Sequence, residues 1–251
     1  MNRTQFDKSV YQTARSRVIE LIKSSHDWEK TEGFIADGII CPDEYERQRL
    51  RILCVLAESY GYAEEGVIDI ETQLVDDVMG LGNSSVQTPR KLATLLWLLL
   101  TSLTSGEKVQ WEDLPCLFQV NPDYTSILQT TLSKVAWINV KKASRAEGTS
   151  MEPEEVYAHA LRNREVLRGQ LEAIAPHLLI VCGEVPFRAL HEAQLLGPEI
   201  ELGQKWRIQQ TEAGPGVLEV THPSSWRGYE KLYERFGQIY SQLAESNYPI
   251  H

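Results

Sequence analysis

The sequence predicts an α/β fold, a three-layer α/β/α arrangement with a central, mostly parallel four-stranded sheet and a helical N-terminal extension. Four short apolar segments have the length of strands, and helical patterns separate them. Two of the four are almost continuously apolar, as expected of strands buried on both faces of a parallel sheet. Strands that alternate with helices predict one domain over residues 1–251, with an extension at 1–50 and an α/β core at 51–246.

The predicted strands follow the apolar runs RILCVLA, VAWINV, LLIVC and VLEVT, at residues 51–57, 135–140, 178–182 and 217–221. Between and after them, apolar residues recur with helical spacing. The predicted helices cover residues 89–103, 149–176, 186–196 and 225–246. Pro89 suits a first helical turn, and Thr149 and Glu152 have the spacing of a capping box. Residues 1–50 are predicted to be helical throughout and to pack against the sheet.

Length and composition predict a soluble globular protein. A chain of 251 residues with 42% hydrophobic content can bury a sizeable core. The run Leu95–Leu100 is far shorter than the roughly 20 residues that span a bilayer. The N-terminus lacks the apolar stretch of a signal peptide, so we expect a cytoplasmic protein with no membrane partner. The cysteines are spread singly, which predicts no metal site, no cofactor, and core thiols at Cys54 and Cys182.

The charge is unevenly distributed along the chain. A net charge of −10 argues at first against a nucleic-acid partner. However, residues 52–89 contain no lysine or arginine and carry seven acidic residues. Residues 124–146 contain no acid and carry Lys134, Lys141, Lys142 and Arg145. Because much of the acidity is confined to one segment, a basic face elsewhere on the molecule is allowed.

Polar residues follow the predicted strands where each one ends. In open parallel sheets, ligands bind outside the carboxyl ends of the strands. Glu58 follows the first strand, Asn139 ends the second, Gly183 follows the third and His222 follows the fourth. Each has an ordinary alternative, since a lone glutamate is often a helix cap or surface acid and a lone histidine is often structural. Asn139 is the stronger sign, because an amide inside an apolar strand needs hydrogen-bond partners.

Four short motifs resemble, in the same order, those of the uracil-DNA glycosylase superfamily. They are LAESY at 56–60, WIN at 137–139, VCG at 181–183 and HPSSW at 222–226, and the resemblance covers roughly residues 50–240. Leu56 stands where the family has glycine and Ser59 where it has proline. These departures indicate a divergent prokaryotic member whose substrate differs from plain uracil. Some prokaryotic members of this superfamily remove modified cytosines from phage DNA, and an altered first loop would suit a bulkier base.

The resemblance implies roles for individual residues. Glu58 and His222 would be catalytic: the carboxylate stabilises an oxocarbenium-like sugar and orients water, and the imidazole donates to the departing base anion. Asn139 and Tyr60 would recognise a flipped base. The implied DNA-binding residues are Ser224, Ser225, Trp226, Arg227, Lys141, Lys142 and Arg145, with Trp226 as a wedge that fills the gap in the duplex. The alternative for Trp226 is packing at the start of the last helix, and for the lysines a solvated loop.

The expected function is therefore that of a monomeric DNA glycosylase. It would hydrolyse the N-glycosidic bond of uracil or a modified, cytosine-derived base in duplex or single-stranded DNA and leave an abasic site, in DNA repair or in antiviral defence. Two other functions stay open. A catalytically silent sensor of modified bases is favoured by the departures in the first motif, and a small-molecule nucleoside hydrolase would better explain the acidity of the chain.

Overall fold

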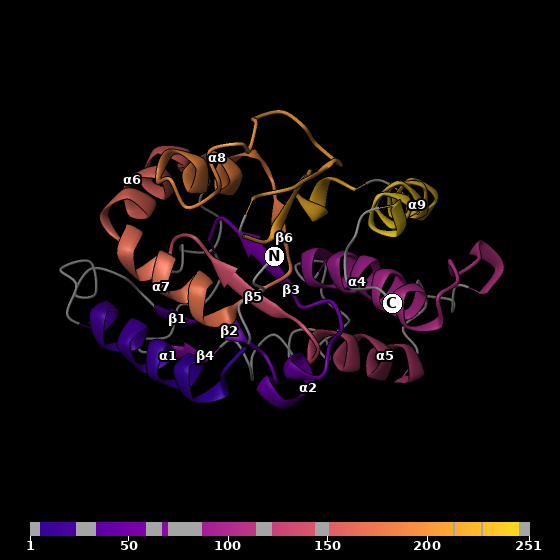
Figure 1. The fold of residues 1–251 in the computed structure, drawn as a ribbon, viewed down its shortest axis with the longest axis horizontal. Coiled ribbons are helices and arrows are strands. Elements are labelled where there is room, and N and C mark those ends of the chain that lie inside the picture. Colours follow the sequence, from indigo (N-terminus) through magenta and orange to yellow (C-terminus); the bar gives the residue numbers. More distant parts are fainter. Residues whose placement is uncertain are drawn as a thin grey trace.

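The computed structural model describes residues 6–23, 34–58, 67–69, 87–113, 122–143, 151–212, 214–226 and 228–245. Its main sheet has six strands in the order β2-β5-β3-β6-β8-β7 (Figure 1). The inner four are parallel: β5 (Ala136–Asn139), β3 (Ile52–Leu56), β6 (Leu178–Cys182) and β8 (Gly216–Val220). The edge strands β2 (Gly38–Ile39) and β7 (Ile208–Gln209) are antiparallel to their neighbours. The prediction of a mostly parallel sheet is confirmed, and its four strands are the inner part of a larger sheet.

Both faces of the sheet are buried by helices. Side chains of Cys54, Ile180 and Leu218 belong to a core with α4 (Gln87–Ser105), α5 (Pro122–Leu132) and α9 (Tyr229–Glu245). Their strand neighbours, such as Val55 and Val181, belong to a second core on the opposite face. This second core is built with α1 (Lys8–Lys23), α6 (Pro153–Arg162), α7 (Arg164–Ile174) and α8 (Glu184–Glu192). Figure 1 shows the two groups of helices on opposite sides of the sheet, which is compatible with a three-layer α/β/α arrangement.

The N-terminal segment differs from the prediction of an entirely helical extension. α1 and α2 (Pro42–Glu46) are helices, but β1 (Phe34–Ala36) pairs with β4 (Val67–Asp69), and β2 joins the main sheet. At β2, the Ile39 N–H donates to the Tyr11 hydroxyl at 2.6 Å, and a Cβ at Gly38 would collide with that hydroxyl. The glycine therefore lets α1 approach the edge of the sheet, and the prediction of an all-helical segment at 1–50 is wrong.

The helices α4, α8 and α9 overlap their predicted ranges, but α8 ends four residues earlier than predicted and α9 begins four residues later, after a short 3-10 helix. The helix predicted at 149–176 is instead two helices, because Asn163 between α6 and α7 has non-helical backbone angles, φ −105° and ψ 22°. Thr149 of the predicted capping box lies outside the described residues, and Glu152 makes no side-chain cap. The sequence analysis did not predict α5 or β7. Among the described residues, no helix is long and apolar enough to cross a membrane.

Candidate functional site

The carboxyl ends of the parallel strands bring the candidate residues to one edge of the sheet. Leu56 at the end of β3 lies opposite Asn139 at the end of β5. Beyond this pair, the Lys141 N–H donates to the Ala57 carbonyl at 2.8 Å, so Lys141 and Glu58 leave the sheet side by side. On the other side of β3, the Gly183 N–H donates to the Val220 carbonyl at 2.8 Å. The turn after β6 thus lies beside the loop that carries His222.

Glu58 belongs to a small charged cluster. Its side chain is 3% exposed, and the Lys141 ammonium lies 3.1 Å from its Oε2 atom. The same ammonium lies 2.6 Å from Oε2 of Glu155 on α6. Burial alone would lower the pKa of Lys141, but hydrogen bonds to Glu155 and Glu58 outweigh it and raise the pKa above its ordinary value. Lys141 thus bridges a carboxylate at the sheet edge and one on α6. Its predicted contact with DNA stays a prediction, because the ion pairs hold its ammonium beside Glu58 without burying it fully.

His222 follows β8 and caps the short 3-10 helix η4 (Pro223–Ser225). The backbone N–H of Ser224 donates to its Nδ1 at 3.3 Å, and the Ser224 hydroxyl lies 2.7 Å from the same atom. A backbone N–H can only donate, so Nδ1 is an acceptor and the neutral ring carries its proton on Nε2. His222 is exposed as a whole residue, but desolvation by the protein around its ring, and then the positive charge of Lys91, lower its pKa. At neutral pH the ring is therefore a neutral hydrogen-bond donor.

Lys91 is a functional candidate that the sequence analysis missed. It lies in the first turns of α4, and its ammonium donates to the Trp226 carbonyl at 2.8 Å and to the Ser224 carbonyl at 3.3 Å. It therefore ties α4 to the loop after β8 and places a positive charge near the His222 ring. Nothing local in the sequence marks this role, because the two segments are more than a hundred residues apart.

Gly183 lets the turn after β6 lie against the histidine. Its φ of 112° and ψ of 162° fall in a region that essentially only glycine adopts. A Cβ atom at this position would lie 3.6 Å from the Cβ atom of His222, which is ordinary contact. The backbone conformation, more than the available space, therefore requires glycine here. The glycine of the VCG motif thus has a direct structural role beside His222.

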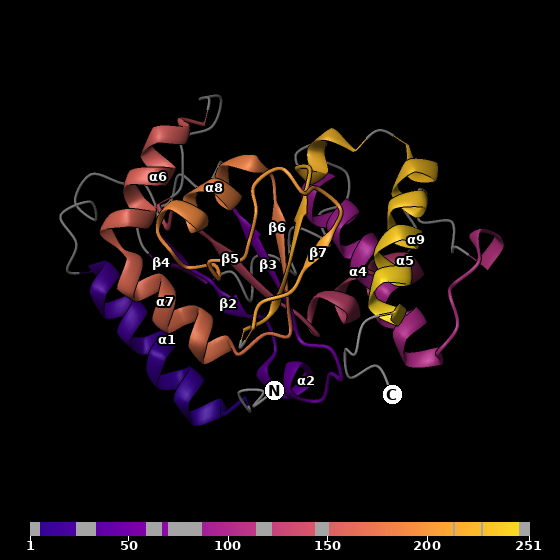
Figure 2. The same ribbon diagram turned by 45° about the horizontal axis from the view of Figure 1, so that its top comes forward.

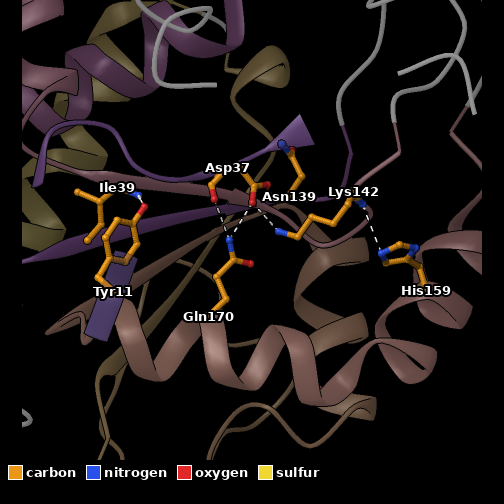
Figure 3. A network of polar contacts seen from close by, with 7 residues as sticks. All are labelled: Tyr11, Asp37, Ile39, Asn139, Lys142, His159 and Gln170. Atoms are coloured by element: carbon orange, nitrogen blue, oxygen red, sulfur yellow. Dashed lines mark hydrogen bonds and ion pairs between the residues drawn. The ribbon is translucent and has the colours of Figure 1, made fainter. Parts of the chain in front are cut away.

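Asn139 is buried at the end of β5, with 1% of its surface exposed, and its main chain belongs to a network around Asp37 (Figure 3). Its N–H donates to Oδ2 of Asp37 at 2.5 Å. The other carboxylate oxygen accepts from the Lys142 ammonium at 2.6 Å and from the Gln170 amide at 2.9 Å. Lys142 is 2% exposed, so its predicted place on a DNA-binding rim is wrong. Its charge is used inside the fold to pair with a carboxylate that the sequence analysis did not single out.

Trp226 also differs from its predicted role as an exposed wedge. The residue is 8% exposed, and its indole N–H donates to the carbonyl of Thr221 at 2.9 Å. Its ring packs against Trp206, with 5.7 Å between ring centroids. In this conformation the ring is part of the core, and the alternative of packing at the start of the last helix holds. Ser224 and Ser225 are exposed on the same loop, and the Ser225 hydroxyl donates to the His222 carbonyl at 2.7 Å.

Three predicted site residues, Tyr60, Arg145 and Arg227, lie outside the described residues, as does most of the acidic segment. In the part of the chain that the structure describes, no three His, Cys, Asp or Glu side chains gather in a group that could hold a metal ion. Comparison with models of protein families finds no match, and neither does comparison with curated proteins. The geometry of the sheet edge is therefore the basis for the proposed function.

Proposed function

We propose that the protein is a DNA glycosylase that hydrolyses the N-glycosidic bond of a flipped-out base and leaves an abasic site. One observation carries the proposal. A buried carboxylate, Glu58, and a neutral imidazole donor, His222, both lie at the carboxyl edge of one parallel sheet, with Gly183 on the strand between them. Motifs that resemble those of a glycosylase superfamily fall on the same residues in the same order.

Breaking the N-glycosidic bond separates charge. The sugar therefore needs a nearby negative group, and the base needs a nearby hydrogen-bond donor. When the bond from the sugar C1′ to the base nitrogen breaks, its electron pair leaves with the base and positive charge develops on the sugar. The Glu58 carboxylate stabilises that cation and orients the water that attacks C1′. Attack by water then requires loss of one proton, which the departing base or solvent accepts.

His222 acts on the leaving base. A base that departs with the electron pair gains negative charge on its carbonyl oxygen, and a donor at that oxygen lowers the barrier. One well-placed donor of this kind contributes roughly 2.7–4 kcal/mol. The neutral ring suits this task because its Nε2–H is already positioned by the Nδ1 hydrogen bonds to Ser224. Asn139, whose main chain is fixed by Asp37, would read the hydrogen-bonding edge of the base once its buried side chain is uncovered.

The substrate we propose is uracil or a larger, cytosine-derived modified base, and the biological setting is repair or defence against phage DNA. This part of the proposal rests on the departures at Leu56 and Ser59 in the first motif. A base panel that includes uracil and hydroxymethylated or glucosylated cytosine separates these substrates.

The proposal is tested by separating DNA binding from base release. Glu58→Ala is expected to abolish release of the base while DNA affinity, measured by fluorescence anisotropy, changes little. Glu165→Ala is the matched control, because Glu165 is an exposed carboxylate on α7 whose only described ion pair is with Arg168. Full activity of the Glu58 variant would refute the catalytic assignment. Tight binding without release by the wild type would support the silent sensor.

A second candidate is a hydrolase of small nucleosides. It is favoured by the burial of Lys142 and Trp226, which removes two residues from the predicted DNA-binding rim. Salt separates the two functions, because phosphate contacts release counterions and DNA affinity falls steeply as salt rises. A Michaelis constant for free nucleosides that barely responds to salt, together with no activity on DNA, would favour the second candidate.

A further inference from the structure

A groove of about 760 Å³ lies between α9, the segment that leads into β7, and the connection after α4. Figure 2 shows α9 alongside the β7 edge of the sheet. The two are joined through Gln242, whose side chain accepts from the Ile208 N–H at 2.9 Å and donates to the Trp206 carbonyl at 2.9 Å. The groove is lined by Lys108, Lys205, Trp206, Arg207, Tyr233 and Arg235, among others.

The groove concentrates positive charge on an acidic protein. Four of its lining residues are cationic, and Glu234 is its one acidic residue. Lys205 has carboxylate partners, Glu184 at 3.3 Å and Glu219 at 3.8 Å. The other cations, Lys108, Arg207 and Arg235, form no ion pair with a carboxylate in the described part of the chain. Glu112 and Asp113 lie close enough to act on Tyr233, beside Lys108, but Arg207 and Arg235 have no carboxylate partner among the described residues, and this indicates a place for an anion.

Aromatic rings hold two of these cations in place. The Arg235 guanidinium lies over the Trp206 ring at 5.2 Å from its centroid. The Lys108 ammonium lies over the Tyr233 ring at 4.8 Å, and the Tyr233 hydroxyl donates to the Val109 carbonyl at 2.7 Å. Such contacts are weakly attractive at exposed sites and restrict the side chains. The cations are therefore partly ordered before any ligand binds.

Gly237 provides the space that Lys108 occupies. A Cβ atom at this position of α9 would lie 2.9 Å from the Lys108 ammonium, which is too close for an unchanged arrangement. A glycine inside a helix costs stability, so its use here needs a packing reason. The close approach of the lysine to the helix supplies that reason.

The groove and the candidate site share a connection through Trp206. Trp206 lines it and packs against Trp226, which directly follows the exposed serines of the His222 loop. The Trp206 N–H also donates to the Glu219 carbonyl in β8 at 2.8 Å, three residues before His222. Trp206 therefore links the groove to the strand that precedes the His222 loop, while Lys108 follows the end of α4 that lies away from that loop.

We propose that this groove binds the sugar-phosphate backbone of the nucleic-acid strand next to the target base. This inference rests on the proposed function for its choice of ligand. The cations come from three separate parts of the fold and line an open, shallow groove, which suits an extended ligand that lies along the surface. A strand with regularly spaced phosphates fits this arrangement better than a single phosphate ion. The groove thereby supplies a basic surface for the strand. Lys142, which the sequence predicts on such a surface, lies in the interior.

The test compares two double variants that remove equal charge. Arg207→Gln with Arg235→Gln removes two groove cations, and Arg47→Gln with Arg168→Gln removes two cations far from the groove, one just after α2 and one in α7, each paired with a glutamate. The probe is a fluorescent single-stranded oligonucleotide, titrated at several salt concentrations. The groove variant is expected to bind about tenfold more weakly, with the slope of log affinity against log salt reduced by about 1.4, because each lost contact removes about 0.7.

The control variant is expected to bind nearly as the wild type does. Lys108→Gln provides an independent single change and should reduce the slope by about 0.7. Equal binding by the two double variants would overturn the proposal, as would tighter binding of a polyglutamate peptide than of the oligonucleotide. Circular dichroism checks that each variant is folded.

Base release measured on the same samples separates this inference from the proposed function. If the groove variant binds weakly but the wild type releases no base, the groove assignment stands and the glycosylase proposal fails. If the wild type releases a base and the groove variant binds and releases as the wild type does, the glycosylase proposal stands and the groove assignment fails.

Discussion

At the scale of single residues, the protonation of His222 connects the structure to the proposed chemistry. The Ser224 N–H fixes Nδ1 as an acceptor, so the ring has a donor only at Nε2. Desolvation of the ring and the Lys91 ammonium lower its pKa from the ordinary value of 6.5. A histidine with a lowered pKa in the folded state contributes stability above pH 6.5, and this contribution is lost as the pH falls through the folded pKa.

The role of Lys91 can be tested by titrating the ring. The His222 imidazole, followed by NMR, is expected to titrate below 6.5 in the wild type and closer to 6.5 in Lys91→Met. Lys91→Arg keeps the charge and should retain most of the lowered pKa. An unchanged titration in Lys91→Met would show that Lys91 does not act on the ring. Any activity should fall in acid, because a protonated ring requires a proton on Nδ1 and disrupts the hydrogen bond from Ser224.

The buried pair of Lys142 and Asp37 carries a prediction about stability. Both side chains are at most 2% exposed, so removing one partner leaves the other charge in the interior. Lys142→Met is expected to lower the free energy of unfolding by about 3–5 kcal/mol, measured by urea denaturation. Adding Asp37→Asn to this variant should restore part of the loss. Lys8→Met is the matched control, because its pair with Asp43 is exposed and its loss should change stability little.

A loss as small in Lys142→Met as in Lys8→Met would contradict this account of the network. The network also explains why sequence reasoning placed Lys142 wrongly. Two adjacent lysines after a strand are typical of a solvated loop, and Asp37, the partner of Lys142, lies 105 positions earlier in a segment predicted to be helical. The fold brings Lys142 and Asp37 together, and no local pattern in the sequence indicates that they pair.

At the scale of elements, the turn from β6 into α8 depends on one glycine. Gly183 adopts a conformation that other residues adopt only under strain, which costs about 1–3 kcal/mol. Gly183→Ala is therefore expected to destabilise the protein by that amount and to reduce activity, because the turn touches the His222 loop. Gly169→Ala in α7 is the matched control: a Cβ atom there meets nothing within 4 Å, and the change should stabilise the helix by about 0.4–1 kcal/mol. Thermal denaturation of the two variants measures both effects, and equal stability would contradict the account.

The elements that were predicted best are those whose own residues show the pattern of a strand or a helix, without reference to distant segments. The inner strands are short apolar runs buried on both faces, and this pattern identifies them without knowledge of their neighbours. The edge strands β2 and β7 are each two residues long, so they carry too little pattern to be recognised. The break at Asn163 was missed because the apolar spacing continues across it.

At the scale of the whole molecule, the distribution of charge is the feature that sequence reasoning described only in part. The sequence allowed a basic face but could not locate it, because the groove cations come from three distant segments of the chain. The positions of Glu58, Asn139, Gly183 and His222 could be predicted, since each follows directly from the end of a parallel strand. Trp226 could not be placed, because a tryptophan after a tight turn suits either a core or a surface.

The central claim is that the protein releases a base from DNA and that Glu58 is required for this, and a single measurement tests it. We would detect, by mass spectrometry, free bases released from DNA that contains uracil, other deaminated bases, or hydroxymethylated and glucosylated cytosine. The wild type, Glu58→Ala and the surface control Glu165→Ala would be compared on the same panel. The account predicts that the wild type and the control release one base, which Glu58→Ala does not release. Release by Glu58→Ala at the wild-type rate, or no release by the folded wild type from any DNA, would contradict it.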